Sequence, residues 1–194
     1  RQRQMCIRDS DGDTVRLIIR VDHASDNAKV IELATSFQFS HGEKHVVVSD
    51  KTLGLRKQWL DAWSPADGDE RGIILEDDVE VSPLWYTWMK KAWDAYGLRS
   101  DLAGISLQRQ TLVPKKPSKQ MEIVNHHQPF LYKLVGSIGF SPHPRRWKEF
   151  LAWVHESDLQ HIDAHVEGLI ASDLYAFLAK TASSAVELKK KIQE

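Results

Sequence analysis

The chain has 194 residues, a mass of 22.2 kDa and 42% hydrophobic residues, which is sufficient for one globular domain with a sizeable core. Its 26 basic and 27 acidic side chains are mixed along the sequence and give a formal charge of -1, so we expect no nucleic-acid partner. Cys6 is the single cysteine, which excludes an intrachain disulfide, and no apolar run reaches the roughly 18 residues that a membrane-spanning helix needs.

The first elements predicted along the chain are a strand and a helix. Residues 1–14 alternate charged and polar groups, and we interpret them as a disordered or non-native leader. The β-branched run from Val15 to Val21 predicts a strand that is buried on both faces of a parallel sheet. Asp26 or Asn27 then caps a predicted helix. Its inner side carries Val30, Ile31, Leu33, Ala34 and Phe37.

The same alternation continues through the middle of the chain. The pattern predicts a strand at Val46–Val48, a helix at Leu53–Trp63 and a strand at Gly72–Leu75, which is typical of right-handed βαβ units. Ser82 as N-cap and Pro83 at the first helical position predict the start of a further helix. Its core-facing stripe is expected to be Trp85, Trp88, Ala92 and Tyr96.

The last part of the chain adds shorter elements. We expect a strand at Ala103–Leu107, an irregular loop at Gln108–Gln128, an apolar, glycine-containing segment at Phe130–Phe140, and helices at Arg145–Val154 and Ala164–Leu178. Residues 181–194 are predicted to form a charged C-terminal helix or tail. Residues 15–180 therefore constitute a single predicted α/β domain with a mostly parallel sheet.

Three consecutive acids, Glu76, Asp77 and Asp78, follow the predicted strand Gly72–Leu75 and precede the helix cap at Ser82. In open α/β sheets, ligands bind at the carboxyl ends of the strands. Adjacent carboxylates repel one another, and a divalent cation that also binds substrate phosphates relieves this repulsion. The alternative is a solvated turn whose acids lie near the positive end of a helix.

The segment Gly72–Pro83 resembles the Glu-Asp-Asp variant of the Asp-X-Asp motif of GT-A glycosyltransferases. Its extension through Tyr86 and Trp88 is similar to the N-acetylglucosaminyltransferase I-like group. The resemblance runs from Val15 to Tyr175 and also fits enzymes like glycosyltransferase family 2. It implies a GT-A-like, mostly parallel sheet flanked by helices. The implied activity is inverting transfer of a sugar from a nucleotide-diphosphate donor, a UDP-sugar, to a hydroxyl of a glycan or other acceptor, with Mn²⁺ or Mg²⁺.

The resemblance also implies roles for individual residues. Asp78 ligates the metal directly, with Asp77 beside it, while Glu76 and Asp77 orient the nucleoside, the sugar or metal-bound water. The remaining implied site residues contact the donor or act as the base. They are Asp22 at the nucleoside, Gly54 and Arg56 at the base pocket, and Asp163 or Glu167 as the catalytic carboxylate.

The sequence departs from this family at its start. GT-A folds begin with a strand ahead of the one predicted at Val15–Val21, and no matching apolar run precedes it here. We therefore expect an incomplete domain that lacks its first strand and shows little or no transfer on its own. A nucleotidyltransferase on a related sheet and a non-catalytic, truncated remnant are the alternative functions. The compartment stays open: the resemblance implies a Golgi-lumenal parent with an N-terminal anchor absent here, and a cytoplasmic protein is the alternative.

Overall fold

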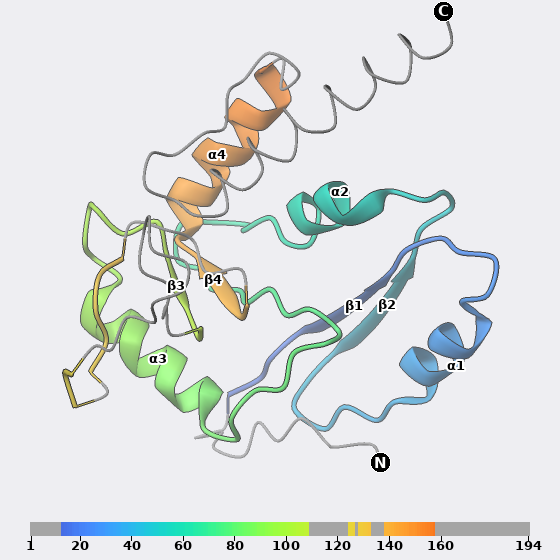
Figure 1. Ribbon diagram of the computed structural model, residues 1–194, viewed down its shortest axis with the longest axis horizontal. Coiled ribbons are helices and arrows are strands. Elements are labelled where there is room, and N and C mark those ends of the chain that lie inside the picture. The colour runs from blue at the N-terminus through green and yellow to red at the C-terminus, as the bar shows by residue number, and fades with distance from the viewer. Residues whose placement is uncertain (1–12, 109–123, 127, 133–137, 158–194) are drawn as a thin grey trace, which may run out of the picture. The chain divides into compact units, whose positions relative to one another are not determined.

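The computed structural model describes residues 13–108, 124–126, 128–132 and 138–157. These residues form four helices, one two-stranded parallel sheet and one two-stranded antiparallel sheet (Figure 1), which confirms the mixed α/β class. The chain divides into two compact units, residues 1–108 with 135–155 and residues 109–134 with 156–194. None of the described helices has the length and apolar character needed to cross a membrane. The helices expected at Ala164–Leu178 and 181–194 lie outside the described residues.

The first sheet pairs β1 (Leu17–Val21) in parallel with β2 (Lys44–Val48), from Leu17 opposite Lys44 to Val21 opposite Val48. Helix α1 (Ala28–Ser36) connects the two strands. The expectation that β1 is buried on both faces is wrong, because Ile18 is exposed while Leu17 and Ile19 are half-buried and Val21 is buried. The face of β1 that carries Ile18 and the half-buried Arg20 is therefore only partly covered.

Helix α1 also buries less than its sequence predicts. Ala34 is its buried residue, whereas Val30 and Leu33 are both exposed. Ile31 and Phe37 are half-buried. Within the described residues, only a narrow strip of α1 is therefore covered, since a two-stranded sheet presents less apolar surface than a broad sheet does.

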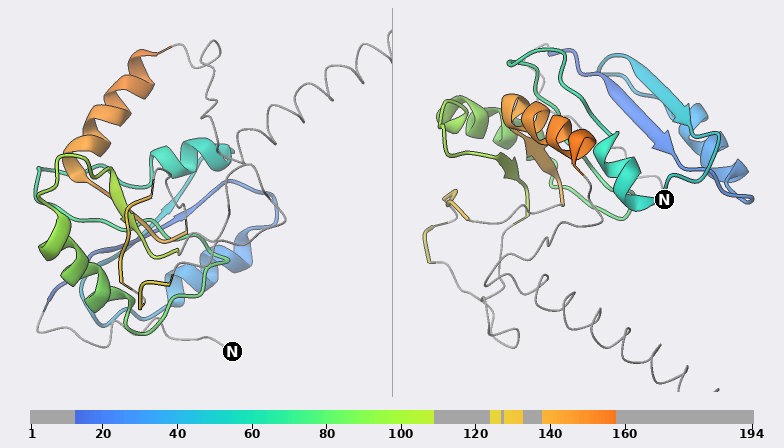
Figure 2. Two further views of the ribbon diagram at one scale, coloured as in Figure 1. Left: turned by 60° about the vertical axis from the view of Figure 1, so that its left-hand side comes forward. Right: turned by 90° about the horizontal axis from the view of Figure 1, so that it is seen from above.

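The second sheet pairs β3 (Gly104–Ser106) with β4 (Phe140–Pro142) in antiparallel fashion. The strand predicted at Gly72–Leu75 is reduced to one antiparallel bridge, in which Ile74 N–H donates to Phe140 O at 2.8 Å and Phe140 N–H donates to Ile74 O at 3.2 Å. The predicted mostly parallel sheet is therefore wrong for this region. The reason is that β4, which lies beside β3 (Figure 2), also pairs with Ile74 and runs opposite to both.

Helix α3 (Trp85–Tyr96) begins three residues after the expected cap. Ser82 still organises its start, because Ser82 Oγ accepts a hydrogen bond from Leu84 N–H at 3.3 Å and Ser82 O accepts one from Trp85 N–H at 3.0 Å. The buried face differs from the predicted stripe, since Trp88 and Tyr96 are exposed. The buried residues of α3, at helical spacing, are Trp85, Met89, Ala92 and Trp93.

The buried residues Met89, Ala92 and Trp93 of α3 form one apolar cluster with Leu102 and Ile105. A second apolar cluster joins α2 (Gly54–Leu60) to α4 (Pro144–Glu156). Helix α4 confirms the prediction at Arg145–Val154, while α2 ends three residues before the expected Trp63. The Trp147 indole N–H donates to Trp63 O at 2.9 Å. The cluster centres on Ile74, Phe140 and Trp147, with Trp59, Trp63 and Leu151 packed against it.

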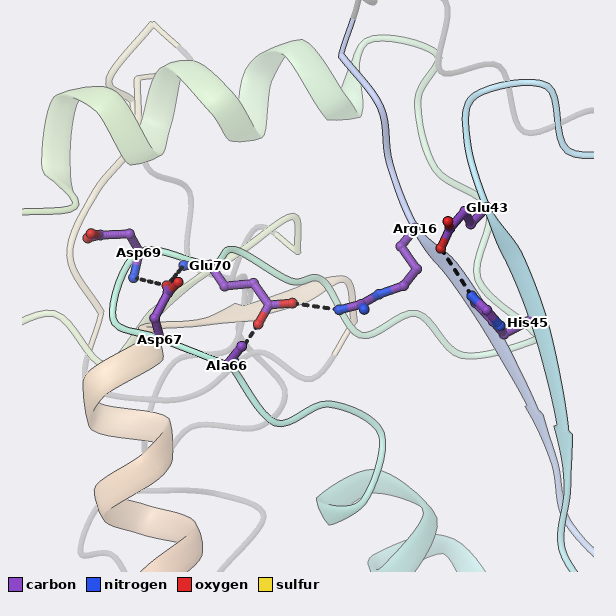
Figure 3. Close-up of polar contacts among 7 residues, drawn as sticks. All are labelled: Arg16, Glu43, His45, Ala66, Asp67, Asp69 and Glu70. Carbon is purple, nitrogen blue, oxygen red and sulfur yellow. Dashed lines mark hydrogen bonds and ion pairs between the residues drawn. The ribbon is translucent and has the colours of Figure 1, made fainter.

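Polar contacts tie β1 and β2 to their neighbours. Arg16, just before β1, forms an ion pair with Glu70 at 2.9 Å, in a loop where the Asp67 carboxylate accepts hydrogen bonds from two backbone N–H groups (Figure 3). Lys44 Nζ donates to three carbonyl oxygens at the end of α1, at 2.9, 2.7 and 2.6 Å. A lysine at a helix C-terminus satisfies carbonyls that have no partner within the helix.

Candidate functional site

The three acids form a turn, which we call the acidic turn (Glu76, Asp77 and Asp78). Val79 N–H donates to Glu76 O at 3.3 Å, so Asp77 and Asp78 occupy the two central positions of the turn. The turn begins two residues after the bridge between Ile74 and Phe140. The acidic turn therefore follows directly on a buried backbone pairing.

The acids of the turn differ in exposure. Glu76 is half-buried, whereas Asp77 and Asp78 are exposed. Neither Asp77 nor Asp78 has a hydrogen bond or an ion pair with another residue in the part of the chain that the structure describes. By contrast, Asp67 and Glu70 are bound to backbone N–H groups and to Arg16 (Figure 3). Two carboxylates of the acidic turn thus remain available for a ligand.

Glu76 has a specific partner that the sequence did not indicate. The indole N–H of Trp59 donates to Glu76 Oε1 at 3.1 Å, which connects α2 to the acidic turn. Trp59 lies in α2 three residues after the predicted site residue Arg56, but no motif in the sequence assigns it this contact. A side-chain contact between two separate elements leaves no local pattern in the sequence.

Asp22, directly after β1, binds the start of α2. Its Oδ1 accepts hydrogen bonds from the N–H of Leu53 and of His23, both at 2.8 Å, and its Oδ2 accepts one from Gly54 N–H at 2.9 Å. These bonds, with the Leu53 amide the strongest, lower the pKa of Asp22 from 3.8 to about 2, although its partial burial acts in the opposite direction. Asp22 is therefore ionised at neutral pH, and it lies beside Gly54, from whose N–H it accepts a hydrogen bond.

The contacts of Asp22 bear on its expected role. Both of its oxygens accept backbone hydrogen bonds, so the carboxylate positions α2 in this structure. Its contact with a nucleoside stays a prediction. Gly54 itself has a φ of 75°, a left-handed conformation that favours glycine, and its N–H donates to Asp22.

Three further predicted site residues are Arg56, Asp163 and Glu167. Arg56 lies in the first turn of α2 with an exposed side chain. Asp163 and Glu167 lie outside the described residues. Asp22, Gly54, Arg56 and Glu76 are connected through α2, because Asp22 binds its first residue and Trp59 near its end binds Glu76.

The fit of a divalent cation depends on the number of ligands that the chain offers. Among the described residues, no three histidine, cysteine, aspartate or glutamate side chains converge into a metal-binding group. Asp77 and Asp78 nevertheless present adjacent, exposed carboxylates. Magnesium-type ions are commonly held by one or two carboxylates together with substrate phosphates and water. The acidic turn fits a cation shared with a diphosphate and does not fit a cage made by the protein alone.

These observations define a mixed α/β protein that presents an acidic turn supported by an aromatic cluster. The chain belongs to the family described as SPBC1E8.03c C-terminal domain, which matches residues 3–160. That description names no activity. Comparisons with curated proteins and with solved structures find no match.

Proposed function

We propose that the protein is a metal-dependent glycosyltransferase of the GT-A type that uses a UDP-sugar. The observation that carries this proposal is the pair of exposed carboxylates, Asp77 and Asp78, without a cationic partner among the described residues. Three adjacent acids are unfavourable unless solvent or a cation screens them. A cation bridging to a diphosphate is the ligand that this charge pattern suits best.

The residues of the chain have distinct parts in this proposal. Asp78, with Asp77 beside it, presents oxygen ligands, while Glu76 orients the donor. When bound, Mn²⁺ or Mg²⁺ neutralises negative charge on the diphosphate, an effect worth several kcal/mol in enzymes of this kind. Asp22 and Gly54 hold the start of α2, from which Arg56 extends into solvent.

The acceptor side is also part of the proposal. An inverting transfer needs a carboxylate that removes the proton from the acceptor hydroxyl as that oxygen bonds to the sugar. Asp163 or Glu167 has this role in the proposal, on the basis of the family resemblance. In the proposal, β1, α1 and β2 form the βαβ unit of a GT-A-type sheet.

Calorimetry of UDP binding tests the proposal. We expect UDP to bind in the presence of Mn²⁺ and at least about tenfold more weakly in its absence. Asp78→Ala should abolish the metal-dependent part. Asp94→Ala, at an exposed acid on α3, is the matched control and should bind as the unaltered protein does. UDP binding that ignores both Mn²⁺ and the loss of Asp78 would contradict the proposal.

A further inference from the structure

We infer that Trp59 is a positioning residue that fixes the carboxylate of Glu76 at the inner end of the acidic turn. The role of Glu76 toward a ligand rests on the function proposed above, whereas the contact itself does not. The bond from Trp59 Nε1–H to Glu76 Oε1 measures 3.1 Å. An indole N–H only donates and a carboxylate only accepts, so the direction of this bond is fixed, and its ionised acceptor strengthens it.

The ring of Trp59 is itself immobilised on two sides. It stacks on Phe140 with ring centroids 5.9 Å apart and an interplanar angle of 18°. It meets Trp147 edge-on at 5.8 Å and 71°. Both of these partners are buried. Aromatic pairs in these geometries contribute beyond their buried area, so the indole N–H is held in one direction.

Trp59 and Glu76 share a common support. The side chain of Phe140 stacks on Trp59, while its backbone exchanges two hydrogen bonds with Ile74, two residues before Glu76. Phe140 of β4 therefore contacts the ring of the donor Trp59 and also binds the backbone close to the acceptor Glu76.

Helix α2 extends this support to the end of β1. Its N-cap Leu53 and its first residue Gly54 donate their N–H groups to Asp22, and its Trp59 donates to Glu76. The result is an asymmetric acidic turn in which Glu76 is half-buried and bound, while Asp77 and Asp78 are exposed. We assign Glu76 the orienting role within the turn and the two aspartates the direct contacts with a ligand.

A purely structural role for Trp59 makes different predictions from a positioning role. If the indole only fills space, Trp59→Phe should retain ligand binding, because phenylalanine preserves a ring against Phe140 and Trp147. If the N–H group positions Glu76, Trp59→Phe should weaken UDP binding in the presence of Mn²⁺ about tenfold while the thermal midpoint changes little. Trp153→Phe, at an exposed tryptophan of α4, is the control for ring replacement.

Hydrogen exchange of the indole N–H tests the contact without any ligand. The chain has 7 tryptophans, and Trp59→Phe identifies the resonance of Trp59 in a spectrum of ¹⁵N-labelled indoles. We expect slow exchange in the unaltered protein and faster exchange in Glu76→Ala. Glu76→Gln should restore protection, because its amide oxygen remains an acceptor.

The two measurements separate failure of this inference from failure of the proposed function. Exchange at Trp59 that ignores Glu76→Ala would overturn the positioning role, as would a folded Trp59→Phe that binds UDP and Mn²⁺ normally. Protected exchange in a protein that binds no UDP with Mn²⁺ would instead refute the proposed function and support the contact. Protection together with weakened binding in Trp59→Phe supports both.

Discussion

Two regions of the molecule are stabilised in different ways. The parallel layer, which comprises β1, α1 and β2, buries Val21 and Ala34 and leaves several of its apolar side chains exposed. The apolar region, which comprises α3, β3, β4, α4 and the bridging residue Ile74, contains two clusters built around large side chains. Its main buried residues are Ile74, Met89, Trp93, Phe140 and Trp147.

Polar contacts to the ends of secondary structure hold the parallel layer. Asp22 binds the start of α2, Lys44 binds the end of α1, and Arg16 pairs with Glu70. Helix α2 belongs to both regions, because its start is bound to Asp22 and its Trp59 packs on Phe140. The acidic turn is therefore supported by packed aromatic rings through Trp59 and, through Asp22 and α2, by hydrogen bonds to a charged carboxylate.

The largest expected effect follows from removing the centre of the apolar region. Trp147→Ala should lower the free energy of unfolding by about 3–5 kcal/mol, because it leaves a cavity and removes the bond to Trp63 O. Urea unfolding followed by circular dichroism measures this effect. Trp153→Ala, on the exposed side of α4, should cost under about 1 kcal/mol. Equal losses in the two variants would contradict the assignment of the core.

The next effect concerns Asp22 and depends on pH. The pKa of Asp22 is lowered from 3.8 to about 2, so its ionised form stabilises the protein above pH 3.8, and this contribution disappears as the pH falls toward about 2. Asp22→Asn should therefore be less stable at neutral pH, and the difference from the unaltered protein should shrink over that acidic range. Urea unfolding at a series of pH values measures the difference.

Asp26→Asn, at an exposed acid before α1, is the control for Asp22 and should show no such convergence. A difference between Asp22→Asn and the unaltered protein that stays constant down to pH 2 would show that the carboxylate charge of Asp22 does not hold α2.

The smallest of the three effects concerns Lys44. Lys44→Met keeps the aliphatic part of the side chain and removes three hydrogen bonds to the end of α1. The expected loss is about 1–2 kcal/mol, with reduced helical content as α1 frays. Circular dichroism and urea unfolding measure both changes, with Lys51→Met as an exposed control. An unchanged free energy of unfolding would remove Lys44 from the contacts that hold the parallel layer.

Local sequence patterns were sufficient for much of the fold. The β-branched runs in β1 and β2 and the helical spacing in α4 predict these elements correctly, because their signals lie within a few consecutive residues. The buried face of α3 was predicted less well, since the predicted stripe included the exposed Trp88 and Tyr96 and left out the buried Met89 and Trp93. Residue type alone does not decide which side of an amphipathic helix is covered.

The features that the sequence did not predict depend on contacts between elements that are distant in the chain. The segment at Ile74 was expected to be a parallel strand, but Phe140 pairs with it in the antiparallel direction, and this partner is remote in the sequence. The acidic turn was recognisable from three consecutive acids. The bond that Trp59 makes to Glu76 was not, because it depends on how α2 packs on β4.

The central claim is that the acidic turn binds a divalent cation shared with a diphosphate. Crystals of the protein grown with UDP and Mn²⁺ test it directly through the anomalous scattering of manganese. We predict an anomalous peak within bonding distance of the Asp78 carboxylate and of the diphosphate oxygens. Manganese bound elsewhere, or a diphosphate placed away from Asp77 and Asp78, would contradict the claim.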